Sequence, residues 1–300
     1  MFSLNRKFKV EGIITALVTP LTESGEIKEE AFEELIDFQL KHGVKGFFPL
    51  GTAGEGMKLP VEKRMKAAEI VVEKTRGRVP IILHVGTQDT ETTVDLAKHG
   101  KEIGADAIGA VGPFFYKPDT EGLIMHYKRI GEAVDLPLFV YNNVSGQGYN
   151  ITVDTFGLIA EECPTVCGVK DTSYRVDQIQ EYVYRFGDEY TIISAGDPLI
   201  FANLAVGAVA HICAVSNVVP EIPVQIYEAV KRKDFDRARE LQFKLNEIRK
   251  ALKKGPYLAT YKEALRMRGI DVGTVSSPLR PMKDSERKRL REELEKLGII

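Results

Sequence analysis

The residue with the clearest chemical potential in this sequence is Lys170, which directly follows the apolar run 166–169. A short apolar run that ends in a loop is typical of a buried strand. A lysine at the end of such a strand is poorly solvated, which favours the neutral amine and lowers its pKa. A neutral amine is the nucleophile that forms a Schiff base with a ketone. From position alone, two other interpretations stay open: the side chain extends outward to solvent, or it pairs with Asp171.

Tyr141 and the turn at residues 51–54 are the next candidates. Tyr141 closes the apolar run 138–141, where its phenol could carry a proton, although a packed core tyrosine is an equally good interpretation. The turn Gly51-Thr52-Ala53-Gly54 presents successive backbone N–H groups with little side-chain cover, which suits a carboxylate or a phosphate. Glycine-rich turns are common, so this signal is weak by itself.

Eight apolar runs must position these groups, and amphipathic segments separate them. The runs are nearly continuous rather than alternating, which is typical of parallel strands covered on both faces. Gly43, Gly104 and Gly207 stand where left-handed caps would end the intervening helices. The predicted strands are 13–18, 46–50, 81–85, 107–111, 138–141, 166–169, 191–194 and 209–214.

Strands that alternate with helices indicate an α/β fold, either a doubly wound sheet or a (β/α)₈ TIM barrel. No G-x-G-x-x-G follows an early strand, so a dinucleotide-binding sheet is disfavoured and the barrel is predicted. We expect the barrel catalytic domain over residues 1–220 and a C-terminal helical domain over 221–300. Three helices are predicted there, at 223–254, 257–268 and 284–297.

Composition excludes several other classes of protein. The chain has 300 residues, with 41 Lys and Arg against 43 Asp and Glu. Its formal net charge of −2 does not attract nucleic acid or an anionic membrane. We find no apolar stretch of membrane-spanning length, no secretion signal, and only three cysteines. The histidines are scattered, and no metal-binding or P-loop motif is present. We expect a reduced, cytoplasmic protein without a metal or cofactor.

Taken together, these residues resemble the dihydrodipicolinate synthase/N-acetylneuraminate lyase family of class I pyruvate aldolases. The resemblance covers nearly the whole chain and rests on an ordered set of motifs. They are Val18-Thr19-Pro20, Gly51-Thr52-Ala53-Gly54-Glu55, Pro113-Phe114-Phe115-Tyr116, Tyr141-Asn142, Gly168-Val169-Lys170-Asp171, Ser194-Ala195-Gly196-Asp197 and Ser216-Asn217-Val218.

The resemblance implies a TIM barrel with C-terminal helices, assembled as a homotetramer built from dimers. It implies that Lys170 condenses with a 2-oxo acid such as pyruvate, that Tyr141 transfers protons, and that Thr52 hydrogen-bonds this tyrosine. The turn at Thr52 and Ala53 would hold the carboxylate of the 2-oxo acid. We also expect Gly196, Asn143 and Gln147 to bind substrate.

Three positions depart from the family pattern. Ala53 lacks the hydroxyl of the usual Thr or Ser, and Phe115 stands where many relatives lend a tyrosine across the dimer interface. Dihydrodipicolinate synthases carry a carboxylate-binding arginine at about Gly146, but no Lys, Arg or His occurs between Tyr141 and Lys170. A charged amino-aldehyde would therefore lack its partner in this loop, whereas amides and hydroxyls suit a neutral polyol.

These observations predict a lyase that cleaves or forms a 2-keto-3-deoxy sugar acid from pyruvate and an aldehyde. Two alternatives stay open. The first is 4-hydroxy-tetrahydrodipicolinate (dihydrodipicolinate) synthase, or a related dehydratase or hydratase-aldolase. The second is a non-catalytic protein that only binds a 2-oxo acid.

Overall fold

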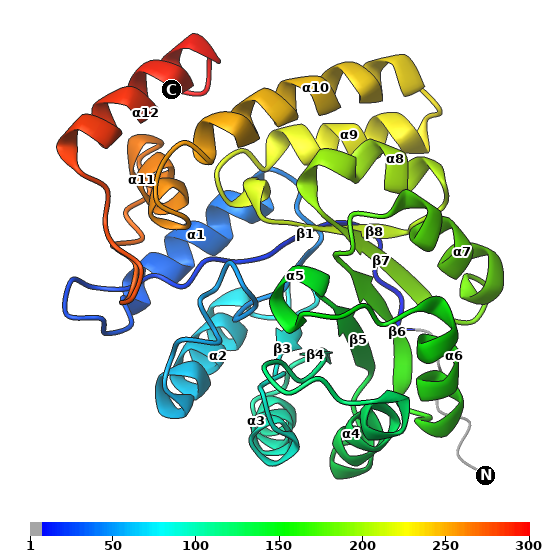
Figure 1. Ribbon diagram of the computed structural model, residues 1–300. Helices are drawn as coiled ribbons and strands as arrows, with labels where there is room; N and C mark the ends of the chain where they lie inside the picture. Colours follow the sequence, from blue (N-terminus) through cyan, green and yellow to red (C-terminus); the bar gives the residue numbers. More distant parts are fainter. Residues whose placement is uncertain (1–7) are drawn as a thin grey trace.

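Eight parallel strands form the centre of the molecule in the computed structural model, which describes residues 8–300 (Figure 1). The strand order is β2-β1-β8-β7-β6-β5-β4-β3, and a parallel bridge from Phe47 to Ile81 joins the two end strands. The sheet therefore closes into a (β/α)₈ TIM barrel, as predicted. The strands are β1 Gly12–Thr15, β2 Gly46–Phe47, β3 Ile82–His84, β4 Ala107–Val111, β5 Leu138–Asn142, β6 Val166–Asp171, β7 Thr191–Ala195 and β8 Ala210–Cys213. The signal-sequence prediction rests partly on residues 1–7, outside the described part.

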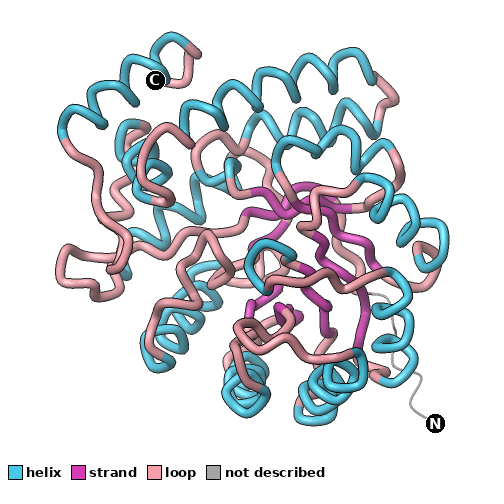
Figure 2. Tube along the Cα trace, viewed as in Figure 1, coloured by secondary structure: helices cyan, strands magenta, loops and turns pink. Residues whose placement is uncertain are grey.

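Helices surround this barrel on its outer face, so each strand is buried on both sides (Figure 2). Gly43, Gly104 and Gly207 all have positive φ angles, which confirms the predicted caps. None of the helices within residues 8–300 combines the length and apolar character that a bilayer crossing requires. The helices are α1 Glu29–Lys41, α2 Val61–Thr75, α3 Thr90–Glu102, α4 Thr120–Ala133, α5 Val144–Gln147, α6 Val153–Glu162, α7 Val176–Phe186, η1 Asp197–Leu199, α8 Ile200–Ala205, η2 Val215–Asn217, α9 Glu221–Lys231, α10 Phe235–Leu252, α11 Ala259–Met267 and α12 Asp284–Lys296.

All eight predicted strands are present, but the single helix predicted at 223–254 is wrong. It is divided into α9 and α10, because Lys233 takes a left-handed conformation with φ of 61° and interrupts the helix. Asp234 then caps α10 by accepting a hydrogen bond from the Arg237 N–H at 3.1 Å. Neither a glycine nor a proline marks this turn, so the sequence carries little signal for it.

The helical extension packs directly on the barrel and its outer helices. α9 contacts β1 and α8, so it completes the outer ring of helices after the last strand. α10 packs on α9, α8 and η1, and Figure 1 shows the two long helices running side by side. α9 therefore contacts the barrel directly, whereas α10 packs mainly on α9, and the domain boundary at residue 220 stays a prediction.

A buried ion pair joins the barrel to this extension. Lys262 on α11 lies 2.7 Å from the carboxylate of Glu55, which follows β2, and neither side chain is exposed by more than 1%. Lys58 lies 2.7 Å from the other carboxylate oxygen. Burial would raise the pKa of Glu55, but the two lysines outweigh it and hold that pKa below its usual value. The pair fixes the turn that precedes Glu55 against the C-terminal helices.

We expect Glu55→Gln to destabilise the protein by about 3–5 kcal/mol, because it leaves the Lys262 ammonium buried without its charge partner. Urea unfolding at neutral pH measures this change. Because the pKa of Glu55 is lowered on folding, its contribution is present above its usual pKa and is lost as the pH falls below it. The double variant Glu55→Gln/Lys262→Met should recover part of the loss, and equal stability of wild type and Glu55→Gln would contradict this role.

Candidate active site

A cavity of about 540 Å³ opens where the carboxyl ends of the strands meet. This end of a TIM barrel is where the βα loops converge and where catalytic residues lie in barrel enzymes. The lining combines side chains from the barrel loops with side chains from the helical extension. Its polar members include Thr52, Tyr141, Asn143, Lys170, Thr172, Tyr174, Asp197, Arg249, Lys253 and Tyr257.

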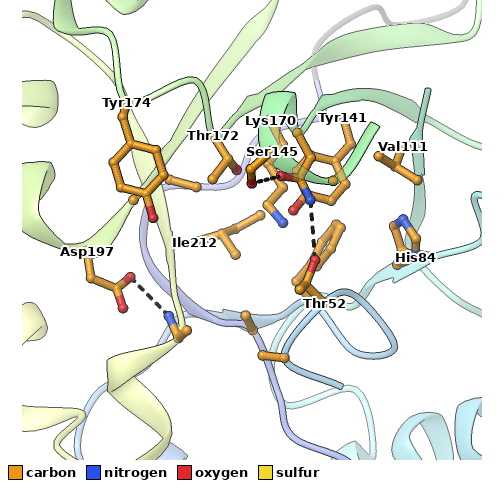
Figure 3. A pocket seen from close by; sticks show the side chains of 18 of the residues that line it. Thr52, His84, Val111, Tyr141, Ser145, Lys170, Thr172, Tyr174, Asp197 and Ile212 are labelled. Carbon is orange, nitrogen blue, oxygen red and sulfur yellow. Dashed lines mark hydrogen bonds between the residues drawn. The ribbon is translucent and has the colours of Figure 1, made fainter. Parts of the chain in front are cut away.

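Strand register places Tyr141 and Lys170 side by side. Tyr141 of β5 and Lys170 of β6 are direct partners in the parallel ladder, so their side chains leave the sheet on the same face. The neighbouring pair, Asn142 and Asp171, points to the opposite face. The two candidate catalytic residues therefore both enter the barrel interior, as Figure 3 shows.

Two aromatic rings shield the amine of Lys170. Its Nζ lies 3.5 Å from the centre of the Tyr141 ring and 3.8 Å from the centre of the Phe48 ring. The residue is 4% exposed, and no carboxylate within residues 8–300 forms an ion pair with it. Burial lowers the pKa of Lys170 well below its usual value, and the carboxylate of Asp197 opposes this shift only in part. The site thus favours a neutral amine.

The two other interpretations of Lys170, extension of its side chain to solvent and pairing with Asp171, are both excluded. The side chain is buried, so it does not extend to solvent. The carboxylate of Asp171 is fully used elsewhere: one oxygen accepts from the amides of Asn142 and Gln178, both at 2.7 Å. Its other oxygen accepts from the backbone N–H and hydroxyl of Ser173 at 2.8 and 2.5 Å. Asp171 fixes the end of β6 instead of neutralising the lysine.

The phenol of Tyr141 lies in the cavity near the hydroxyl groups of Thr52 and Thr172. Burial raises the pKa of Tyr141, while the hydroxyls of Thr52 and Thr172 lower it and oppose that shift. The Asn143 amide donates to the Thr52 hydroxyl at 3.3 Å (Figure 3). A buried phenol beside a hydroxyl can hold and return a proton during a reaction at the neighbouring amine.

The turn from Gly51 to Glu55 presents unpaired backbone donors. Within the described residues, no acceptor is in hydrogen-bond reach of the N–H groups of Thr52 and Ala53. The chain can fold this tightly because Gly56 has no side chain: a Cβ there would lie 1.8 Å from the carbonyl oxygen of Leu50. Free N–H groups in a turn are suited to bind a carboxylate.

The other predicted site residues divide into two groups. Gly196 and Asn143 line the cavity beside Thr52 and Ala53. Gln147 is buried outside the lining, because its amide donates to Asn142 and to the carbonyl of Tyr149 at 3.0 and 2.9 Å. Its oxygen accepts the backbone N–H of Asn143 at 3.2 Å. Gln147 therefore holds the loop after β5 in shape and has no amide group left for substrate.

Four lining residues come from the helical extension and were not predicted. They are Arg249 on α10, Lys253 and Tyr257 in the segment that follows it, and Tyr261 on α11. The prediction that the loop after β5 is uncharged holds. The loop itself offers a charged amino-aldehyde no partner, as expected, but Arg249 on α10 and Lys253, which follows that helix, bring two cations to the same cavity.

His84 is a further unpredicted lining residue, and a buried arginine controls its position. Arg64 donates through Nη2 to the carbonyl oxygens of His84 and Gly86 at 2.7 and 3.1 Å. Both hydrogens of Arg64 Nη2 are used in these two bonds, so Nη2 does not donate to His84 Nδ1. This Nδ1 instead donates to the carbonyl of Leu50 at 3.1 Å. Burial, followed by the charge of Arg64, lowers the pKa of His84 well below its usual value. A neutral imidazole therefore packs against the rings of Phe48 and Tyr141.

Metal-ligating side chains do not gather in this site. Across residues 8–300, no group of three or more His, Cys, Asp or Glu side chains is placed to hold a metal ion.

Comparison with known proteins gives the same family over nearly the whole chain. The model of the dihydrodipicolinate synthetase family matches residues 9–297. A 4-hydroxy-tetrahydrodipicolinate synthase from Methanopyrus kandleri is 36% identical over 294 residues, which is 98% of each chain.

Solved structures agree on the fold. Dihydrodipicolinate synthase from Aquifex aeolicus superposes with a TM-score of 0.91 at 33% identity, covering 97% of this chain and 99% of the other. CdNal from Clostridium difficile, solved in complex with mannosamine, superposes with a TM-score of 0.93 at 26% identity, covering 96% and 99%. With a buried lysine and a tyrosine in register at the barrel mouth, this chain belongs to the dihydrodipicolinate synthetase family and is a carbon–carbon lyase, a class I aldolase that acts on pyruvate through a lysine imine.

Proposed function

We propose that Lys170 is the imine-forming lysine, and the observation that carries this assignment is its buried amine, 3.5 Å from the centre of the Tyr141 ring. The amine attacks C2 of pyruvate, and loss of water gives an iminium that draws electrons from C3. Loss of a C3 proton gives an enamine, and its C3 bonds to the aldehyde carbon. The phenol of Tyr141 gives its proton to the new alkoxide, and water then releases the product from Lys170.

The turn at Thr52 and Ala53 is the proposed site of the pyruvate carboxylate. Its free N–H groups lie at the same end of the barrel as Lys170, and Gly196 lines the same cavity. The missing hydroxyl at Ala53 removes one donor but leaves the backbone donors in place. Thr52 has a second role in this proposal, because its hydroxyl also orients the phenol of Tyr141.

Aspartate semialdehyde is the acceptor that the combined observations favour. With this acceptor, its own amine attacks C2 in place of water and displaces the Lys170 amine, which closes the ring and gives 4-hydroxy-tetrahydrodipicolinate. The Methanopyrus kandleri relative carries this activity in its name. The sequence-based objection to an anionic acceptor is removed by Arg249 and Lys253, which line the cavity although the loop after β5 is neutral.

A sugar-derived aldehyde is the second candidate, which would make the chain an aldolase of 2-keto-3-deoxy sugar acids. The hydroxyl and amide groups of Asn143, Ser145, Thr172 and Tyr174 line the cavity and suit a polyhydroxylated chain. The structural neighbour that holds mannosamine accepts a sugar in the same fold.

We propose further that copies of this chain associate as a homotetramer. Phe115 and Tyr116 are 86% and 80% exposed in the loop after β4, and their rings contact each other. Adjacent exposed aromatic side chains are typical of a protein–protein contact. Phe114, next to them, lines the cavity, so association there would bring a second copy near the site.

Borohydride reduction in the presence of pyruvate should attach a three-carbon unit to Lys170 at neutral pH, because its lowered pKa leaves the amine free to react. Peptide mass spectrometry identifies the labelled residue. Lys262 is an internal control: it is equally buried, but it is paired with Glu55 and should stay unlabelled. Label at another lysine, or label that persists in Lys170→Ala, would overturn the assignment.

A comparison of three aldehydes, each supplied with pyruvate, should identify the acceptor: aspartate semialdehyde, glyceraldehyde and glyceraldehyde 3-phosphate. We expect the highest kcat/KM with aspartate semialdehyde, whereas preference for either triose would favour the sugar-acid activity.

Tyr141→Phe should keep the pyruvate label but lose about 10²–10⁴-fold in turnover, since it removes the transferable proton. Pyruvate labelling of the wild type without turnover of any aldehyde would favour a binding protein.

Sedimentation velocity should show a species of four chains. Replacing Phe115 and Tyr116 by Ser should shift the distribution to smaller species, because it removes exposed apolar area from the proposed contact. Tyr184→Ser is a matched control at a tyrosine that is 89% exposed on α7. A wild-type protein that sediments as a monomer at all concentrations would exclude the assembly.

A further inference from the structure

One face of α10 is held against the mouth of the barrel. Gln242, Asn246, Arg249 and Lys253 recur at helical spacing and therefore share this face. Gln242 anchors it, since its amide donates to the carbonyl of Asp197 and accepts the N–H of Phe201, both at 2.9 Å. Further along the helix, Arg249 and Lys253 reach the cavity that contains Lys170.

These two cations have no acidic partner. Three other basic residues of α10 pair with a nearby carboxylate, whereas Lys244 forms no ion pair within the described residues: the pairs are Arg237 with Glu240, Arg239 with Asp236 and Lys250 with Glu247. No carboxylate within residues 8–300 forms an ion pair with Arg249 or Lys253. Like charges at this spacing on a helix destabilise it, and burial together with the charge of Arg249 lowers the pKa of Lys253. An anion between them would relieve this repulsion.

No carboxylate among the described residues that line the cavity forms an ion pair with Arg249 or Lys253. Asp197 is the one carboxylate among its described lining residues. Its two oxygens accept the backbone N–H groups of Ala214 and Val215 at 3.1 and 2.9 Å, so they stabilise the turn after β8. Asp197 makes no ion pair with α10, and its charge only partly opposes the lowering of the Lys253 pKa, so the two cations stay without an ion-pair partner.

A phenolic donor lies beside the cations on this wall. Tyr257 is half-exposed, and partial desolvation, with the charges around it, raises its pKa to about 12. It therefore stays protonated at neutral pH and can donate a hydrogen bond. Two cations and a phenol form an arrangement that recognises a carboxylate or a phosphate.

We propose that Arg249, Lys253 and Tyr257 form a subsite for an oxyanion at the far end of the second substrate. The inference rests on the proposed function, in which pyruvate occupies the Lys170 end of the cavity. A volume of about 540 Å³ is within the range of pockets that enclose drug-sized ligands, so it leaves room beyond a molecule as small as pyruvate. The helical extension thereby selects aldehydes with a terminal carboxylate or phosphate over neutral ones.

The test measures KM for each aldehyde in Arg249→Gln, Lys253→Gln and the double variant. We expect KM for aspartate semialdehyde or glyceraldehyde 3-phosphate to rise about 10- to 100-fold, because a charge-assisted contact is lost. KM for neutral glyceraldehyde should not change. Which of the two anionic aldehydes responds more strongly distinguishes a carboxylate from a phosphate. Lys250→Gln is the control, one residue along the helix and paired with Glu247.

Binding of inorganic phosphate, measured by titration calorimetry, gives a readout without turnover: the wild type should bind it and the double variant should not. Equal effects on neutral and anionic aldehydes, or phosphate binding that survives in the double variant, would overturn the subsite. Pyruvate labelling of Lys170 should be intact in all of these variants. Loss of labelling in the wild type would instead refute the proposed function, so the two failures are distinguishable.

Discussion

The site depends on keeping water away from one amine. The rings of Phe48 and Tyr141 cover Lys170 Nζ, and the carboxylate of Asp197 offsets the lost solvation only in part. Close packing of β5 and β6 makes this possible. Gly168 precedes Lys170 on the same face, and a Cβ there would lie 2.1 Å from the carbonyl of Thr191 and 2.8 Å from the ring of Phe139. The absence of a side chain at this position lets the barrel interior close under the lysine.

The fold places the groups that suit the 2-oxo acid and the groups that suit the aldehyde on opposite walls of the cavity. The strands and the turn after β2 present a buried amine, a phenol and free N–H groups, which suit a 2-oxo acid. The loop after β5 and helix α10 form the opposite wall, with amides, phenols and two cations.

The helical extension is part of the active site because it is fixed to the barrel at two places. The ion pair between Glu55 and Lys262 fixes the turn after β2, and Gln242 fixes α10 to the loop after β7. Both contacts are buried, and each joins residues far apart in the chain. They hold Arg249 and Lys253 near a cavity that the barrel alone would leave open on one side.

The sequence by itself determined the order of eight strands, the cap glycines, and the positions of Lys170, Tyr141 and the turn at Thr52, because apolar runs and turn residues are local signals. It did not reveal the helix break at Lys233, the internal hydrogen bonds that occupy Gln147, or the approach of Arg249 and Lys253 to the cavity. Only the tertiary structure decided these. Whether a polar side chain is already bonded, or which distant helix faces a cavity, depends on contacts between segments far apart in the chain, and spacing along one segment does not encode them.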